Sequence, residues 1–253
     1  MFSRRRERVE ESRPFWKQRS WQLSAGFLGV VVVLSIVAAL TSATDDTDDR
    51  ARAAAAVGPL SEAAVMKNGR PEGCSTDDSA GDTVPKTAPK DVSWRKLGVG
   101  DVPVSVSAGP TRIEKADKVL WWCYAHTPAG AIMAAHVIPS QMSGPDWLTV
   151  TRQQVVAGTG REMFEFQRSL AQDIAPGSDP GPVASYAGYS VISYTSKAAT
   201  IRVLLKGEQG YGACSIDLRW SGGDWKILPG GNGDLQTSMT SVSNVSGYTM
   251  WGG

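Results

Sequence analysis

The sequence has little of the chemistry on which most active sites depend. Among its 253 residues there are two histidines and three cysteines. The histidines, His126 and His136, stand ten residues apart and lack the His-x-x-x-His spacing or the glutamate partner of a zinc site. No glycine-rich loop leads from a strand into a helix, and no serine elbow is present. We therefore expect neither a metal nor a cofactor.

An excess of one charge is also missing from the chain as a whole. The formal net charge is +1, which gives no reason to expect specific binding to nucleic acid. No segment repeats at a fixed period, so a repeat architecture is not indicated. Apolar residues make up 42% of the chain, enough for one good core.

Five side chains are candidates for an acid, a base or an oxyanion partner in a polar pocket. His126 directly precedes a predicted helix, where a histidine more often packs on its neighbours, and His136 lies among Ala and Ile within that helix. We therefore predict that the chain is not an enzyme; an isomerase or cyclase is the alternative. The five candidates are Tyr124, His126, His136, Asp146 and Tyr194.

One long apolar run is present, from Leu23 to Leu40, without a charge over 18 residues. At about 1.5 Å per helical residue, this run with its flanks covers the hydrocarbon thickness of a bilayer. A buried core helix would usually show a polar stripe. A cleavable signal peptide has a shorter apolar region, although "LTSA" at 40–43 is a weak match to its exit site. The run predicts a transmembrane helix over 21–42, with Trp16 and Trp21 at the membrane interface.

The flanks of this run predict its orientation. Residues 1–20 hold seven Arg or Lys against three Glu, whereas acidic residues from Asp45 to Asp49 follow the run. Basic flanks stay in the cytoplasm, so 1–20 is predicted as a cytoplasmic tail and everything after residue 42 as extracytoplasmic. The chain is thus expected in the cell membrane, in contact with lipid, as a single-pass protein.

The outer part divides by composition at about residue 90. Residues 43–90 are rich in Pro, Gly, Asp, Ser and Thr and are predicted to form a flexible tether. Residues 91–253 are predicted to form a domain. Thr127 and Pro128 are typical of a helix start, and two further helices follow. After residue 183 the period changes to two, which predicts an α+β fold of about three helices on a four-stranded antiparallel sheet.

The cysteines Cys74, Cys123 and Cys214 all follow the predicted membrane segment, where disulfides are permitted. Cys123 and Cys214 lie on apolar stretches of the domain and are the candidate pair. Cys74 could instead reach either of them or another subunit, or all three could remain thiols. The odd count leaves one cysteine over in any intramolecular pairing.

Four segments carry a resemblance to known proteins: "PEGC" at 71–74, "CYAHTP" at 123–128, "DLRWSGGDWKILP" at 217–229 and "GYTMWGG" at 247–253. With the helix and strand order, "DLRWSGGDWKILP" resembles the last hairpin of the nuclear transport factor 2-like cone, whereas the other three segments resemble membrane proteins encoded on actinobacterial conjugative and integrative elements. A single anchor, a tether and this cone together resemble the bitopic assembly-factor subunits of conjugative type IV secretion systems encoded on actinobacterial mobile elements. A related topology occurs in membrane proteins associated with lipid-import complexes.

The resemblance implies a structural subunit of a DNA-transfer complex that self-associates and binds other subunits through its outer domain. The alternative is an envelope lipid-binding or ligand-binding accessory of a lipid-import complex. The expected contact surfaces are an open sheet face and the C-terminal tail, although the tail is favoured to be tucked on the domain. Their residues are Tyr189, Tyr194, Tyr248, Met250 and Trp251.

Overall fold

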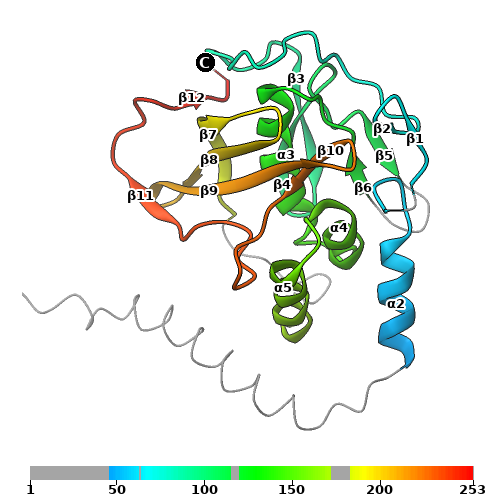
Figure 1. The fold of residues 1–253 in the computed structure, drawn as a ribbon. Coiled ribbons are helices and arrows are strands. Elements are labelled where there is room, and N and C mark those ends of the chain that lie inside the picture. The colour runs from blue at the N-terminus through cyan, green and yellow to red at the C-terminus, as the bar shows by residue number, and fades with distance from the viewer. Residues whose placement is uncertain (1–45, 63, 115–119, 172–182, 253) are drawn as a thin grey trace, which may run out of the picture. The chain divides into compact units, whose positions relative to one another are not determined.

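The fold is described from a computed structural model that covers residues 46–62, 64–114, 120–171 and 183–252 (Figure 1). Residues from Asp46 onward form one compact unit. Its helices are α2 (Asp46–Ala56), α3 (Pro128–Gln141), α4 (Trp147–Gln154) and α5 (Thr159–Leu170). The main sheet contains β7 (Ser185–Tyr194), β8 (Ala198–Gly207), β9 (Gly210–Ser221), β10 (Asp224–Ile227), β11 (Thr240–Val242) and β12 (Thr249–Met250).

The main sheet is antiparallel, with the strand order β10-β9-β8-β7-β12. β9 pairs with β10 along its second half and with β11 along its first half. Gly222 and Gly223 turn the chain between β9 and β10 with φ values of 64° and 75°, a conformation that favours glycine. The four strands predicted from the alternating pattern, β7 to β10, are present.

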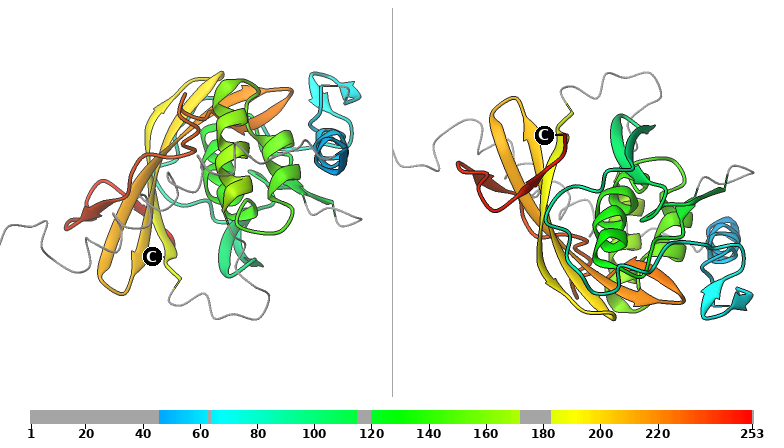
Figure 2. Two further views of the ribbon diagram at one scale, coloured as in Figure 1. Left: turned by 90° about the horizontal axis from the view of Figure 1, so that it is seen from below. Right: turned by 90° about the horizontal axis from the view of Figure 1, so that it is seen from above.

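Helix α3 forms the centre of the core. It contacts strands of the main sheet on one side and β4 (Gly100–Ser105) on another. Eleven of its 14 residues are buried, as expected for a helix that is apolar all round. Thr127 and Pro128 begin this helix as predicted, and Thr127 Oγ1 accepts a hydrogen bond from the N–H of Gly130 at 3.2 Å. Figure 2 shows the helices beside the twisted sheet from two directions.

Small residues let α3 begin close to the chain that leads into it. A Cβ atom at Gly130 would lie 1.9 Å from the carbonyl oxygen of Ala125, so only glycine fits there. Helices α4 and α5 follow and confirm the two further helices that the sequence predicts. α2 packs against α4, and α4 contacts α5.

Three two-stranded antiparallel sheets complete the fold. They join β1 (Met66–Lys67) to β2 (Arg70–Pro71), β3 (Val92–Leu97) to β4, and β5 (Arg112–Glu114) to β6 (Leu120–Trp122). β4 is the inner strand of its hairpin, and its residues from Val102 to Ser105 are buried.

The prediction of about three helices on a four-stranded sheet is wrong. The described residues form four helices, a six-stranded main sheet and three small sheets. β11 and β12 have three and two residues, too few for an alternating pattern to show in the sequence. They form because the C-terminal segment folds back along β9 and β7.

The tether expected over 43–90 also differs from the structure. Gln153 of α4 donates to the carbonyl of Ala55 at 3.2 Å and accepts from the N–H of Leu60 at 2.9 Å. Lys226 donates to the carbonyl of Leu60 at 2.8 Å, and Leu60 is buried. Two side chains of the domain therefore hold this segment in place, which its polar composition did not reveal.

The predicted transmembrane segment over 21–42, the cytoplasmic tail, and Trp16 and Trp21 lie outside the described residues. Within the part of the chain that is described, no helix has both the length and the apolar character to cross a membrane.

Candidate functional site

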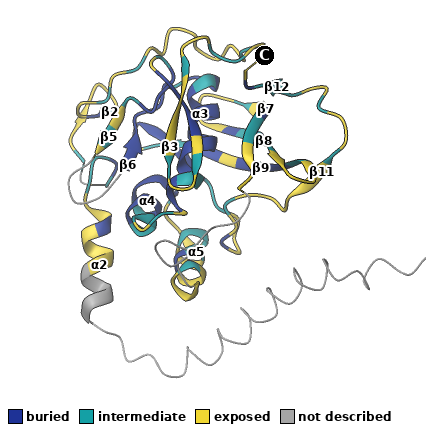
Figure 3. Cartoon of the chain, turned by 180° about the vertical axis from the view of Figure 1, so that it is seen from behind, coloured by how far each residue is buried: buried dark blue, intermediate teal, exposed yellow. Residues whose placement is uncertain are grey.

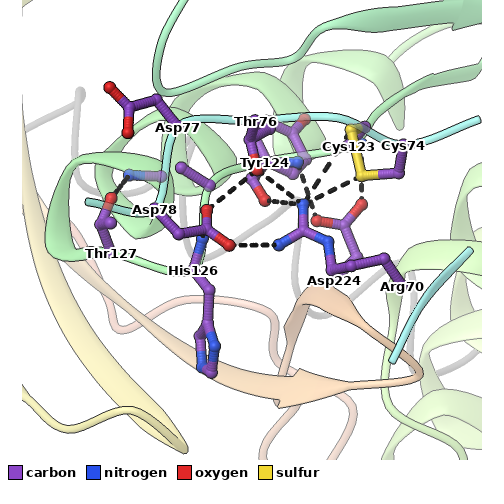
Figure 4. Close-up of polar contacts among 12 residues, drawn as sticks. Arg70, Cys74, Thr76, Asp77, Asp78, Cys123, Tyr124, His126, Thr127 and Asp224 are labelled. Atoms are coloured by element: carbon purple, nitrogen blue, oxygen red, sulfur yellow. Dashed lines mark hydrogen bonds and ion pairs between the residues drawn. A yellow bond between two sulfur atoms is a disulfide. The ribbon is translucent and has the colours of Figure 1, made fainter. Parts of the chain in front are cut away.

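Charged side chains and sulfur atoms gather where the N-terminal segment meets the start of α3 (Figure 4). Arg70 comes from β2, Cys123 follows β6, and Asp224 begins β10. Segments far apart in the sequence thus meet at one place. We call this group the Arg70 clasp, meaning Arg70, Cys74, Asp78, Cys123 and Asp224.

The disulfide joins Cys74 to Cys123, across 49 residues of sequence. The candidate pair Cys123–Cys214 is therefore wrong. Cys214 is a free, buried thiol on β9, opposite Val203 of β8. Cys74, the partner of Cys123, lies in the segment 43–90 that was predicted to be a tether. Arg70 and its neighbours hold this segment against the start of α3, which brings Cys74 to Cys123.

Arg70 is the organising side chain of the clasp. Its Nη2 donates to the carbonyl of Tyr124 at 2.7 Å and to Thr76 Oγ1 at 3.0 Å, and it contacts Cys74 Sγ at 2.9 Å. Nη1 forms an ion pair with Asp78 at 3.3 Å. The guanidinium also lies 4.9 Å from the centre of the Trp220 ring. One cation thus binds the disulfide segment, the start of α3 and β9 together.

Asp224 is buried and accepts hydrogen bonds from successive backbone N–H groups. Its oxygens accept from the N–H of Cys123 at 2.8 Å and of Tyr124 at 2.9 Å. Cys123 has a φ of 72°, which is uncommon outside glycine. Burial raises the pKa of Asp224 from 3.8 to about 6, although the backbone hydrogen bonds and Arg70 act in the opposite direction.

His126 lies at the edge of the clasp and is held by structural contacts. Its Nε2–H donates to the carbonyl of Ser196 at 2.5 Å, and its backbone N–H donates to Asp78 at 2.8 Å. The ring stacks on Trp220, with centroids 3.8 Å apart. Tyr194 donates to the carbonyl of His126 at 3.5 Å, and burial raises the pKa of Tyr194 to about 12.

His136 belongs to a second, separate polar centre inside the core. Its Nδ1–H donates to the carbonyl of Ile132 at 2.7 Å, and its Nε2 accepts from the indole N–H of Trp251 at 3.2 Å. Burial lowers the pKa of His136 to about 4, so the ring is neutral at physiological pH. Nδ1 is thus used within α3, and Nε2 joins α3 to the C-terminal tail.

The other two candidates also have structural places. Tyr124 is fully buried, its hydroxyl donates to the carbonyl of Trp121 at 3.2 Å, and burial raises its pKa well above 10. Asp146 stands at the N-cap of α4, where its carbonyl accepts from the N–H of Val150 at 3.1 Å. The structure therefore brings Tyr124, His126 and Tyr194 to one region and leaves His136 and Asp146 elsewhere.

The predicted contact residues fall into two groups. Tyr189 and Trp251 are buried and pack on each other, with ring centroids 4.8 Å apart. Neither can therefore be part of a partner surface, because Tyr189 faces α3 and the tail covers it. Tyr194, Tyr248 and Met250 are half-buried.

The clasp is suited to holding segments together rather than to binding a metal. Among the described residues, no group of three or more His, Cys, Asp or Glu side chains is placed to hold a metal ion. Its one reactive bond is the disulfide, whose reduction would release Cys74 from the start of α3. The Nη atoms of Arg70 bond to the carbonyl of Tyr124 and to the side chains of Thr76 and Asp78, and the oxygens of Asp224 accept from backbone N–H groups.

Sequence reasoning missed Arg70 and Asp224. Asp224 directly follows the Gly222-Gly223 turn and begins a short strand whose four residues are all buried. An acidic residue at the start of such a strand was the one available signal. Arg70 carries no local signal for its contacts with the carbonyl of Tyr124 and the ring of Trp220, because both lie far away in the sequence.

A protein family model described as a domain of unknown function (DUF8175) matches residues 54–250. The match covers most of the chain, so the chain belongs to this family. It begins within the segment predicted as a tether, in agreement with the packed position of Leu60. No curated protein and no solved structure matches the chain.

Proposed function

We propose that this member of the DUF8175 family is a single-pass membrane protein whose outer domain is a structural subunit of a conjugative DNA-transfer complex. The observation that carries the proposal is the disulfide between Cys74 and Cys123. Disulfides persist in oxidising compartments and are rare in the cytosol. The cross-link therefore supports an extracytoplasmic domain, on the side that the basic tail of 1–20 predicts.

A role through surface contacts is supported by the way the polar side chains are used. His126, His136 and Asp224 make their hydrogen bonds to backbone groups or to Trp251. In such positions they stabilise the fold instead of facing a substrate. The more specific role in DNA transfer rests on the resemblance to bitopic assembly factors of conjugative systems. Its partners would be other subunits and further copies of the chain.

The packing beneath α3 counts against the ligand-binding alternative. A lipid held by a cone-shaped domain would lie between the helix and the sheet. Tyr189, His136 and Trp251 fill that space with rings 4.8 to 6.3 Å apart. The hollows lined by Asp217 and by Tyr211 have volumes of about 200 and 430 Å³ and open on the surface.

The proposal is tested by photo-crosslinking in cells. A photoreactive residue is placed in the full chain at the exposed Val106 or Ile192, and buried Ile201 serves as the control position. We expect mass spectrometry to identify channel subunits, a transfer ATPase or a second copy of the chain at the exposed positions. Recovery of lipid-transport proteins, or no protein adduct, would contradict the scaffold role.

The compartment is tested separately by alkylation of the chain taken directly from cells. We expect Cys74 and Cys123 to react only after reduction and denaturation, whereas Cys214 reacts after denaturation alone. Intact mass reports the number of labels. Labelling of all three cysteines without reductant would contradict an oxidising, outer location.

A further inference from the structure

Helix α5 exposes its apolar face to solvent, whereas the apolar face of a surface helix usually packs on the core. Met163, Phe166 and Leu170 are exposed by 38%, 44% and 36%. The one buried residue of the helix is Glu165, which is 3% exposed. In Figure 3, α3 is mostly dark blue, whereas α5 is mostly yellow and teal. The apolar face of the helix thus points away from the domain.

The inner side of α5 is held by charged groups and by Phe164, whose ring packs against the core and lies 6.4 Å from the Trp147 ring. Glu165 forms an ion pair with Arg152 of α4 and lies 3.8 Å from Arg161. Arg168, one turn further along, places its guanidinium over the ring of Trp147 at 5.1 Å. These contacts fix the helix on α4 without using Phe166 or Leu170. Docking on α4 therefore leaves the apolar face of Met163, Phe166 and Leu170 partly exposed, which makes it a candidate contact site.

The position of α5 relates it to the predicted anchor. Figure 1 shows α5 and the N-terminal end of α2 at the same end of the domain. The left panel of Figure 2 shows the domain from that end. α2 is viewed along its axis and the green helices are viewed from the side, so the green helices run across the direction of α2. The predicted membrane segment ends at residue 42, four residues before Asp46. At roughly 3.6 Å per residue, the chain can span no more than about 14 Å over that distance.

The size of the face favours a membrane over a protein partner. Large side chains bury roughly 150–250 Å² each, so exposures near 40% leave on the order of 250 Å² for the three residues together. A stable protein interface needs about 800 Å² from each partner. A face this small is useful where another element already holds the domain beside its target. An anchor within a few residues of α2 would hold the domain beside the membrane. It would thereby raise the effective concentration of the α5 face at the membrane surface.

We propose that the outward face of α5, formed by Met163, Phe166 and Leu170, lies in the outer interface of the bilayer that anchors the chain. The inference rests on the proposed membrane anchor. An amphipathic helix with such a face lies in the plane of the interface and buries its apolar side chains at the boundary of headgroups and acyl chains. The occupant of the face is thus lipid, and its effect is to fix the orientation of the outer domain on the membrane.

The test uses the full chain reconstituted into vesicles of phosphatidylethanolamine and phosphatidylglycerol. In a Cys214→Ala background, the single variant Phe166→Cys carries a maleimide nitroxide. Ser246→Cys is the matched control, since Ser246 is exposed and stands close to β12, away from α5 (Figure 1). Electron paramagnetic resonance then measures collisions of each label with oxygen, which dissolves in lipid, and with a water-soluble nickel chelate.

We expect the label at 166 to lose most of its nickel collisions and to gain oxygen collisions relative to the label at 246. Equal nickel access at both positions, in vesicles that retain the chain after carbonate extraction, would overturn this inference alone. Line broadening at 166 that disappears on dilution with unlabelled chain would overturn it in favour of a second copy. Loss of the chain on carbonate extraction would contradict the anchor, and with it the proposed function.

Discussion

Helices α3 and α5 use their apolar side chains in opposite ways. α3 is apolar all round and buries eleven of its 14 residues, because it has the main sheet on one side and the β3–β4 hairpin on another. α5 buries only Glu165 and turns Met163, Phe166 and Leu170 outward. An apolar stripe thus indicates that a helix forms, but not which of its faces the domain covers.

The same difference applies to the polar groups of the two helices. In α3, His136 is neutral and bonds to Ile132 and Trp251, so its polarity is satisfied within the core. In α5, Glu165 is paired with Arg152 and sets the side on which the helix docks. Folding energy should therefore come from apolar packing in α3, and in α5 from a charged contact beside the smaller apolar contact of Phe164.

Ile132→Ala tests the first half of this comparison and should have the largest effect. Ile132 is fully buried in α3. Removing its side chain leaves a cavity, so we expect the free energy of unfolding to fall by about 2–5 kcal/mol. Urea denaturation of the full chain in detergent, followed by near-ultraviolet circular dichroism, measures the change. A loss below about 1 kcal/mol would show that α3 is not the centre of the core.

The buried titratable groups near α3 should give opposite pH dependences. The pKa of His136 is lowered from 6.5 to about 4, so its contribution to stability is present above pH 6.5 and is lost as pH falls toward 4. The pKa of Asp224 is raised from 3.8 to about 6, so its contribution is present below pH 4 and is lost as pH rises toward 6. The two slopes oppose each other between pH 4 and 6.

The pH dependence of stability that each of these two groups causes should appear when the other group is replaced. In Asp224→Asn, we expect the free energy of unfolding to rise by about 3 kcal/mol from pH 4 to 6.5, at 1.36 kcal/mol per pKa unit. In His136→Gln, it should fall by about 3 kcal/mol from pH 4 to 6 by the same conversion. Denaturation at several pH values, with the unaltered chain as reference, gives both slopes. Identical slopes in the two variants would contradict these environments.

Glu165→Gln tests the second half of the comparison. The substitution removes the charge that pairs with Arg152, and hydrogen bonds to charged groups contribute about 1.5–3 kcal/mol, so we expect a loss of that size. Glu162→Gln is the matched control, since Glu162 is exposed in the first turn of the same helix and should cost about 0.5 kcal/mol. Equal effects of the two variants would mean that Glu165 does not fix α5.

Phe166→Ala should have the smallest effect on folding in detergent. Its side chain is 44% exposed, and the charged contacts that join α5 to α4 do not include it. We expect a change within about 0.5 kcal/mol, as for an ordinary surface substitution. The same denaturation curve measures it beside Ile132→Ala. A loss as large as that of Ile132→Ala would place Phe166 in the core and remove the contrast between the helices.

Local patterns in the sequence were enough for helices α3 to α5 and strands β7 to β10, but not for β11, β12 or the three small sheets. Thr127 and Pro128 mark the start of α3 because capping and proline geometry act within one turn. Gly222 and Gly223 mark the hairpin of β9 and β10 because their φ angles favour glycine. Signals of this kind depend on neighbours in the chain, so they can be read without a fold.

The clasp and the direction of α5 depend on partners distant in the sequence. Arg70 donates a hydrogen bond to the carbonyl of Tyr124. Asp224 accepts hydrogen bonds from backbone N–H groups that lie about 100 residues away in the sequence. Which cysteine pairs with Cys123 follows from that arrangement, not from the apolar character of the stretch around Cys214. In the same way, Phe166 belongs to a face whose orientation is set by Glu165 and Arg152.

The most direct test of the account is photo-crosslinking in cells at position 166. A photoreactive phenylalanine analogue replaces Phe166 in the full chain with little change of shape, and the adduct is identified by intact mass and by proteolytic peptides. An outer domain held on its membrane by α5 predicts an adduct with the mass of a membrane lipid on the peptide that contains residue 166. An adduct with protein alone, or with neither lipid nor protein, would contradict it.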